Sequence, residues 1–204
     1  MAQGVIPTWQ GRSVCRMGTD DESRLIGGLE PREIVIAEYD PPWPERYEAH
    51  ARVIREVLGG TLLRIEHVGS TSVPGLAAKP IIDILAVVPD SADESAYVPQ
   101  LAAAGYSLRV REPDFFEHRM LRTAARDVHL HVYSPGAPEI GRMLTFRDRL
   151  RRSAEDRARY EAVKRRLAGQ RWPDMNAYAD AKTGIVESIL AADASSGLPG
   201  RHSA

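Results

Sequence analysis

The chain has 204 residues, of which 43% are hydrophobic and 27% are charged, and its formal net charge is -1. This composition is sufficient for one well-packed domain, and the charge gives no general reason to bind nucleic acid or a membrane surface. The single cysteine, Cys15, excludes an internal disulfide framework. Apolar runs stay shorter than the about 18 residues of a membrane span, and no signal-peptide pattern is present. We therefore expect a cytoplasmic protein.

The first third of the chain is expected to lead from an unstructured segment into helices and a strand. Residues 1–18 are rich in Gly, Arg and Ser without periodicity, which predicts a disordered leader. A capping-box pattern, a β-branched run and helical spacing of apolar residues follow in that order. They predict a short helix over residues 19–28, a strand over residues 33–38 and a helix over residues 44–58.

Hydrophobic periodicity predicts the remaining elements, which become wholly helical after residue 137. The expected strands are residues 62–68, 80–88, 106–110, 115–123 and 127–133. The expected helices are residues 91–104, 140–152, 154–168 and 174–191, and residues 193–204 are expected to be a disordered tail. The order indicates an α/β (α+β) fold with a mixed central sheet. We expect a single domain over residues 19–192, with a helical C-terminal part at residues 138–192.

The strand over residues 80–88 carries one carboxylate in an otherwise apolar sequence. Side chains alternate between the two faces of a strand, so Asp83 shares a face with Ile81 and Leu85. A carboxylate in such a strand is costly unless it meets a cation or a metal ion. We interpret Asp83 as a functional residue, while a structural role as a turn cap or as the partner of a buried arginine remains open.

The loop before this strand is built from small residues. Gly69 and Gly75 allow a close approach of the backbone or a positive φ. The hydroxyl groups of Ser70, Thr71 and Ser72, with exposed backbone N–H groups, can hold an anion, and phosphate is the obvious candidate. The alternative is a simple turn, for which such residues are also typical.

The loop and the strand together resemble a known pattern. Residues 66–76 read Glu-His-Val-Gly-Ser-Thr-Ser-Val-Pro-Gly-Leu, and residues 78–83 read Ala-Lys-Pro-Ile-Ile-Asp. This wording resembles the GrpB-like family and, more generally, the Gly-Ser and acidic-strand pattern of the polymerase-β-like nucleotidyltransferase superfamily. Further matches, which extend the resemblance over roughly residues 25–190, lie at residues 39–44, 129–132, 146–151 and 181–182.

The resemblance implies a fold of nucleotidyltransferase type that binds a nucleotide or a phosphorylated small molecule. The resemblance also includes a domain that occurs fused to dephospho-CoA kinase, where it looks like a folding accessory rather than a catalyst. Family membership therefore does not decide the activity. The family wording Phe146-Arg147-Asp148 makes Arg147 the predicted arginine contact to phosphate. Lys79 and Lys182 are further predicted contacts to the anionic substrate.

One position departs from the superfamily pattern, which has a second carboxylate two residues after the first. Leu85 occupies that position, so Asp83 alone cannot assemble the usual pair of metal ions. Alternation over residues 127–133 puts Asp127, His129 and His131 on one face of the next strand. The predicted metal ligands are Asp83, His129, His131 and His67, of which Asp83 and His131 are the predicted catalytic residues.

Imidazole and carboxylate ligands suit zinc, iron, manganese or nickel better than magnesium. A solvent-facing row of histidines, or a rim that binds an anion, remains the alternative for the two strand histidines. Three functions stay open: a metal-dependent transferase of nucleotidyltransferase type, a non-catalytic binding or folding-accessory module, and an Asp/His metal-dependent enzyme of another reaction class.

Overall fold

The computed structural model describes residues 24–28, 34–172 and 175–195. The expected leader over residues 1–18 and the capping-box pattern at residues 19–22 lie outside the described residues. From residue 43 onward, strands and helices follow one another in the predicted order, and the described chain is helical after residue 137.

The centre of the fold is a five-stranded mixed sheet in the order β1-β2-β5-β4-β3. β2 and β5 run parallel, and every other neighbouring pair is antiparallel. This arrangement confirms the expected α+β fold with a mixed central sheet. The strands are β1 (Arg64–Val68), β2 (Ile82–Val87), β3 (Tyr106–Glu112), β4 (His118–Thr123) and β5 (Val128–Tyr133).

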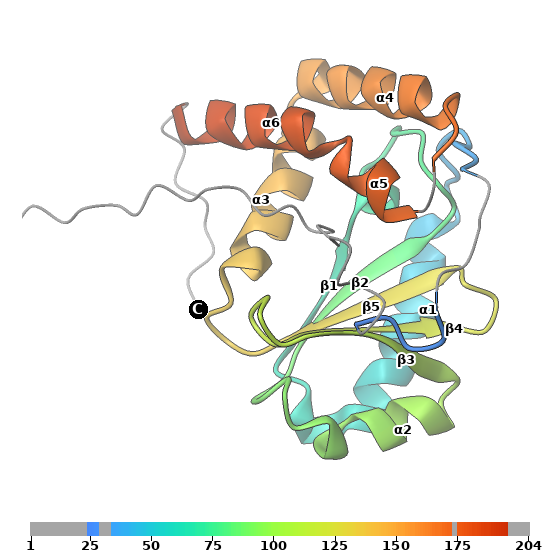
Figure 1. Cartoon of the computed structure of the whole chain (residues 1–204), viewed down its shortest axis with the longest axis vertical. Coiled ribbons are helices and arrows are strands. Elements are labelled where there is room, and N and C mark those ends of the chain that lie inside the picture. The colour runs from blue at the N-terminus through green and yellow to red at the C-terminus, as the bar shows by residue number, and fades with distance from the viewer. Residues whose placement is uncertain (1–23, 29–33, 173–174, 196–204) are drawn as a thin grey trace, which may run out of the picture.

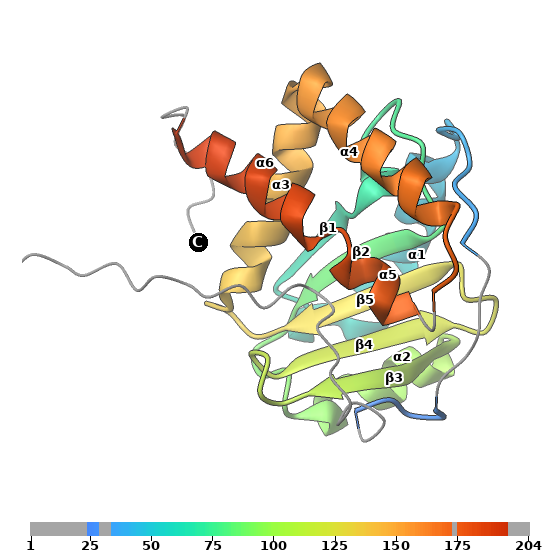
Figure 2. The same cartoon turned by 45° about the horizontal axis from the view of Figure 1, so that its top comes forward.

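The helices fall into two groups (Figures 1 and 2). α1 (Trp43–Leu58) and α2 (Val98–Ala103) lie behind the sheet in Figure 2, whereas the C-terminal helices lie beyond β1 and in front of the sheet. α5 lies in front of β2 and β5 in this view. The C-terminal helices are α3 (Pro138–Arg152), α4 (Ala154–Ala168), α5 (Met175–Asp180) and α6 (Thr183–Ser195).

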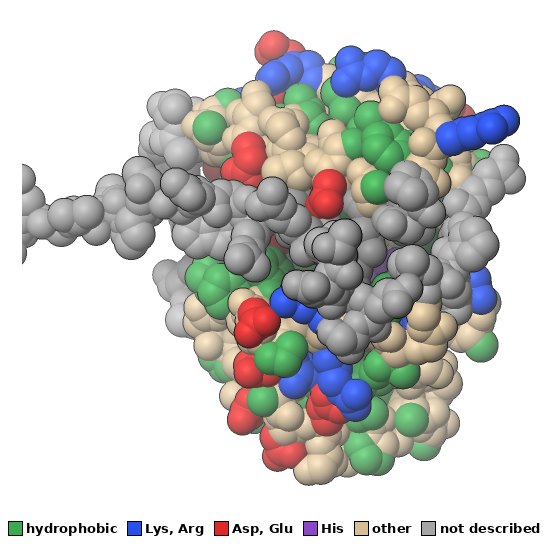
Figure 3. Space-filling model, in the orientation of Figure 1, with side chains coloured by type: hydrophobic (Ala, Val, Ile, Leu, Met, Phe, Trp, Pro, Cys, Tyr) green, Lys and Arg blue, Asp and Glu red, His purple; other side chains and the backbone are tan. Residues whose placement is uncertain are grey.

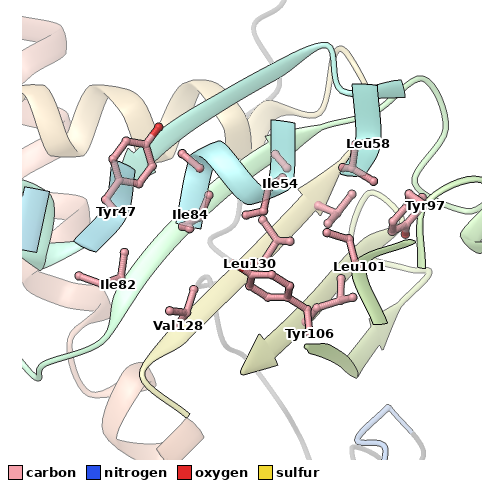
Figure 4. Close-up of a cluster of buried hydrophobic side chains, with 14 of the residues drawn as sticks. Tyr47, Ile54, Leu58, Ile82, Ile84, Tyr97, Leu101, Tyr106, Val128 and Leu130 are labelled. Atoms are coloured by element: carbon pink, nitrogen blue, oxygen red, sulfur yellow. The ribbon is translucent and has the colours of Figure 1, made fainter. Parts of the chain in front are cut away.

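The main hydrophobic core lies between the sheet and the first group of helices (Figure 4). α1 presents the predicted apolar face, and its residue Ile54 is fully buried. From the sheet, Ile84 of β2 and Leu130 of β5 point into the same core. Because alternate side chains on a strand face opposite ways, the neighbours of these residues project to the other face. That second face of the sheet carries Asp83, His129 and His131.

A smaller hydrophobic cluster covers part of the second face. Leu85 of β2 and Tyr133 of β5 pack there against Leu144 of α3. A further cluster joins Val73 and Leu76, in the segment between β1 and β2, to α3, α4 and α6. The helical C-terminal part thus packs both on the sheet and on the loop that carries the Gly-Ser pattern.

Several predicted boundaries are wrong. In place of a strand near residues 34–38, Ala37 forms a single bridge with Ala78, and Leu25 forms a bridge with Val110 where a helix was expected. The helix predicted over residues 91–104 is a short 3-10 turn followed by α2, which begins at Val98 and has Pro99 in its first turn, where proline is favoured. The last predicted helix is divided into α5 and α6, and α6 extends to Ser195, inside the expected tail.

Surface charge is mixed on the face shown in Figure 3, where acidic and basic side chains lie next to one another in the lower part. Among the described ion pairs, Glu94 joins Arg111 and Arg119, each at 2.7 Å. Among the described helices, none has the length and hydrophobicity needed to cross a lipid bilayer.

Candidate functional site

Asp83, His129 and His131 meet on the second face of the sheet. The parallel pairing of β2 with β5 aligns Asp83 with His129 and Leu85 with His131, which brings the three polar side chains together. Asp83 Oδ1 lies 3.6 Å from His129 Nδ1 and 3.8 Å from His131 Nε2. One ligand atom from each residue lies within 4.8 Å of the others. The structure thus brings these three predicted residues together.

The carboxyl group of Asp83 is ionised in this setting. Burial by itself raises the pKa of Asp83, but the neighbouring imidazoles of His129 and His131 outweigh it and hold the pKa below its usual value. The side chain keeps 28% of its exposure, compared with 27% for His129 and 13% for His131. The three groups are therefore partly shielded and still accessible from one side.

The geometry of this cluster fits a transition metal ion. Ligand atoms bound to one ion at about 2.0–2.2 Å in tetrahedral geometry lie about 3.3–3.6 Å apart, close to the distances between Asp83 and the two histidines. Two imidazoles and one carboxylate suit zinc or iron and leave coordination positions open. Metal sites that retain open positions are typical of catalysis rather than of structure.

Gly69 brings the loop directly against Asp83. In the β1–β2 pairing, Val68 faces Asp83, and Gly69 follows immediately with φ 68° and ψ -174°. Only glycine adopts this conformation readily. A Cβ atom at Gly69 would lie 2.9 Å from both Cβ and Cγ of Asp83, so there is no room for a side chain. The glycine and the aspartate of the motif are thus in direct contact.

The hydroxyl groups of the loop have different environments. Thr71 is buried and donates a hydrogen bond to the carbonyl oxygen of Ile81 at 3.0 Å. Ser72 donates to the carbonyl oxygen of Gly69 at 2.6 Å. The Ser72 hydroxyl closes the 3-10 turn (Ser70–Ser72), and the Thr71 hydroxyl ties this turn to the segment before β2. Both hydroxyls are therefore engaged with the backbone rather than with an anion, contrary to our prediction. Ser70 is half-buried, and its hydroxyl makes no hydrogen bond to the described residues, so it is the member of the set that fits a ligand contact.

The structure separates His67 and Asp127 from the cluster. His67 pairs with Ile84 across β1 and β2, which places it on the α1 face, where it stacks on Tyr47 at 4.6 Å. Burial lowers the pKa of His67 to about 4, although Asp83 opposes this shift. Asp127 precedes β5, contacts Thr123 at 2.6 Å and pairs with an arginine of α1. The prediction of His67 as a metal ligand does not fit this placement.

Arg147 lies in a buried ion-pair network. Its side chain donates to Glu66 at 2.9 Å, to the carbonyl oxygen of His67 at 3.0 Å and to Asp148 at 2.7 Å. These contacts tie α3 to β1 and occupy the guanidinium group that we predicted as a phosphate contact. Burial opposes the charged form of Arg147, but the two carboxylates raise its pKa above the usual value. The arginine is therefore placed as a structural residue.

Replacing Arg147 with Met is expected to lower the free energy of unfolding by about 2–3 kcal/mol, since Glu66 and a buried carbonyl lose their partner. Urea denaturation measures this change. Arg55→Met is the matched control, because Arg55 pairs with Glu48 at 3.3 Å on an exposed surface and should cost about 0.5 kcal/mol or less. Equal losses in the two variants would contradict the structural role.

All three lysines of the chain gather near two tyrosines of the C-terminal helices. Lys79 and Lys182 lie over the ring of Tyr178, with Nζ 5.0 Å and 4.7 Å from its centroid. Lys164 is buried, lies over Tyr160 at 4.8 Å and donates to the carbonyl oxygen of Ala77. Burial, followed by the charge of Lys182, lowers the pKa of Lys164 to about 7. The cluster concentrates positive charge at the end of the loop.

Leu85, at the position of the missing second carboxylate, is fully buried between Tyr133 and Leu144. An ionised acid there would lose its hydration without a described cation beside it, at a cost of about several kcal/mol. Leu85 therefore makes a hydrophobic contact with α3 at this position, and the polar side chains that join Asp83 are His129 and His131 of β5.

Sequence reasoning missed three residues around the site. Glu112 and His118 form a buried pair at 2.6 Å, and His118 continues to His131 at 3.1 Å. Burial lowers the pKa of His118 to about 4, although Glu112 opposes this shift. Arg151 donates twice to the carbonyl oxygen of Ser72, at 3.0 and 2.8 Å, and so holds the loop. Glu112 and His118 could have been found from the sequence by pairing residues 112 and 118 across the β3–β4 hairpin.

Comparisons with known proteins agree with the motif. The UPF0157 protein BH1888 of Halalkalibacterium halodurans is 54% identical over 84% of this chain and 90% of its own length. The crystal structure of the conserved protein GrpB from Enterococcus faecalis is 33% identical, with a TM-score of 0.69, over 78% of this chain and 98% of that chain.

A more distant relative is longer than this chain. A dephospho-CoA kinase of Mycolicibacterium paratuberculosis is 31% identical over 70% of this chain, a match that covers 42% of the kinase. The family model described as GrpB protein matches residues 33–192, which include the Gly69 loop, Asp83 and both strand histidines. The chain belongs to the GrpB protein family.

Proposed function

We propose that this protein is a metal-dependent enzyme that acts on a nucleotide or another phosphorylated small molecule. The observation that carries the proposal is the meeting of Asp83, His129 and His131 on one face of the sheet, with ligand atoms within 4.8 Å of one another. Their partial exposure leaves room for a substrate group beside the ion.

The three residues would hold a divalent ion, for which zinc, iron, manganese and nickel are the candidates and magnesium fits less well. A bound ion of this kind polarises a phosphoryl or carbonyl oxygen and orients the reacting groups. Transfer of a nucleotidyl or phosphoryl group is the reaction class that the motif favours. Hydrolysis or rearrangement of a small polar substrate uses the same ligand set and is the alternative reaction class.

Two features support a phosphorylated ligand. The Gly69 turn lies against Asp83 and leaves the hydroxyl of Ser70 without a described partner. The lysine cluster places Lys79 and Lys182 at the end of the same loop, on one tyrosine ring. Ammonium groups bind phosphate as point charges, so the two lysines provide the charge that a phosphate group needs.

A second candidate function is a non-catalytic binding or folding-accessory module. Two observations favour it. Leu85 fills the position of the second acid, and the region that matches this chain in a dephospho-CoA kinase covers less than half of that kinase. This candidate predicts binding without turnover. Product analysis therefore separates it from the enzyme.

Calorimetric titration with ATP and CTP, in the presence of Mn²⁺ or Zn²⁺, tests the proposal. Lys182→Met is expected to weaken nucleotide binding about tenfold, the effect of losing about 1.4 kcal/mol of charge-assisted contact, and to leave metal affinity unchanged. Arg46→Met, which removes a cation of α1 next to Asp127, is the control and should change neither affinity. Equal nucleotide binding by all three proteins would refute the phosphate role, and binding without any product would favour the accessory module.

A further inference from the structure

We infer that Glu112 and His118 are positioning residues for His131. They hold His131 as the tautomer with its proton on Nδ1, so that the lone pair of Nε2 points toward Asp83. This inference deepens the proposed function, because the metal-binding consequence rests on the proposed site. The tautomer itself can be measured without any metal.

Two hydrogen-bond contacts lead across the second face of the sheet toward Asp83. Glu112 Oε2 lies 2.6 Å from His118 Nδ1, and His118 Nε2 lies 3.1 Å from His131 Nδ1. His131 Nε2, on the far side of the ring, lies 3.8 Å from Asp83 Oδ1. In each of the two histidines, one ring nitrogen therefore points toward Glu112 and the other points toward Asp83.

The chemistry of the first contact determines the direction of the later ones. A carboxylate oxygen accepts hydrogen bonds, so His118 Nδ1 carries the hydrogen and donates a hydrogen bond to Glu112 Oε2. In the neutral imidazole, Nε2 of His118 is then an acceptor, and the donor opposite it is Nδ1–H of His131. With its hydrogen on Nδ1, His131 keeps a lone pair on Nε2, the atom on the side of Asp83 that would bind a metal ion.

Packing fixes the orientation of these rings. His118 is 4% exposed and stacks on Tyr133 at 4.7 Å with an interplanar angle of 18°. It also stacks on His131 at 5.3 Å and 14°. β4 and β5 place the two histidines near each other, since Met120 of β4 pairs with His131 and His118 projects to the same face. The rings therefore cannot rotate independently.

Carboxylate–histidine contacts of this kind tune metal ligands in proteins. The outer partner fixes the tautomer and raises the basicity of the ligand, and its loss typically weakens metal binding about 10–100-fold. Here the carboxylate acts through an intervening histidine. A purely structural role for the buried pair Glu112–His118 would be complete without the contact to His131, so the tautomer of His131 is the property that separates the two roles.

Nitrogen-15 NMR of the histidine rings in the metal-free protein measures this tautomer directly. The wild type should show His131 with a protonated Nδ1 and an unprotonated Nε2. His118→Phe keeps an aromatic ring for stacking but removes the acceptor, so His131 should shift toward the Nε2–H form. His118→Gln should retain the original tautomer, because its amide oxygen reaches the position of Nε2.

Metal titration of the same variants provides a second measurement. His118→Phe is expected to weaken Zn²⁺ or Mn²⁺ binding about 10–100-fold, and His118→Gln to restore it to within a few-fold of the wild type. His50→Phe is the matched control, since His50 contacts Tyr106 at 2.7 Å and should leave metal affinity unchanged.

An Nε2–H tautomer of His131 in the wild type overturns the inference, and this measurement stays decisive even if His118→Phe does not fold. Unchanged metal affinity in folded His118→Phe also overturns it. A wild type that binds no metal but shows the Nδ1–H tautomer rejects the proposed metal site and supports the role of Glu112 and His118, so the two failures are distinguishable.

Discussion

Replacing Asp83 with Asn is expected to weaken divalent metal binding by at least about 100-fold, because it removes the only carboxylate among the three ligands and with it the charge that attracts the cation. Metal content of the purified protein and titration with Zn²⁺ and Mn²⁺ measure the change. The amide is close in size to the carboxylate, so the contact with Gly69 is preserved and the loss of affinity can be assigned to the missing charge.

Asp114→Asn is the matched control for this experiment. Asp114 is exposed and pairs with Arg24 at 3.0 Å, so the same change of charge there should leave metal affinity and stability almost unchanged. His131→Ala should reproduce the loss seen in Asp83→Asn. If Asp83→Asn binds the ion as tightly as the wild type, the three residues do not form the metal site.

Alternation along strands was sufficient to predict the centre of this site. Asp83 stands alone among apolar residues, and the histidines at positions 129 and 131 are two residues apart, so each pattern by itself defines a face. The structure brings these faces together because β2 and β5 are neighbours in register. The fold class and most elements were predictable for the same reason, since hydrophobic periodicity is a local property.

Contacts between segments far apart in the sequence, including the register of paired strands, were not predictable. The wrong predictions for individual site residues follow from this. His67 is on the opposite face because it pairs with Ile84 rather than with Asp83, a difference of one residue in the register. Arg147 has the residue type of a phosphate contact, but the fold places two carboxylates beside it. Glu112 lies beyond the end of the predicted strand, so its pairing with His118 was not foreseen.

The second face of the sheet is divided by chemistry along β2. At its start, Asp83 faces His129 and His131, and one position further along the same face Leu85 is buried under α3. A second acid would require α3 to withdraw from the sheet, so the helical C-terminal part and the single-carboxylate site belong together. With Leu85 buried under α3, the two side chains that join Asp83 in the cluster come from β5.

Replacing Gly69 with Ala is expected to have the largest effect on stability. The conformation at φ 68° and ψ -174° costs a non-glycine residue about 1–3 kcal/mol. The added Cβ would also lie 2.9 Å from Cβ and Cγ of Asp83, so the loop or the carboxylate must move. We expect a loss of about 3–4 kcal/mol in the free energy of unfolding, measured by urea denaturation, when both contributions are included.

Gly75→Ala separates the two contributions. Gly75 lies in the same loop with φ 76°, but a Cβ atom there meets nothing within 4 Å, so only backbone strain of about 1–2 kcal/mol remains. Metal affinity should fall in Gly69→Ala, because the displaced carboxylate no longer faces His129 and His131, and should stay unchanged in Gly75→Ala. Equal losses of stability in the two variants, with metal binding intact in both, would show that the contact between Gly69 and Asp83 does not position the carboxylate.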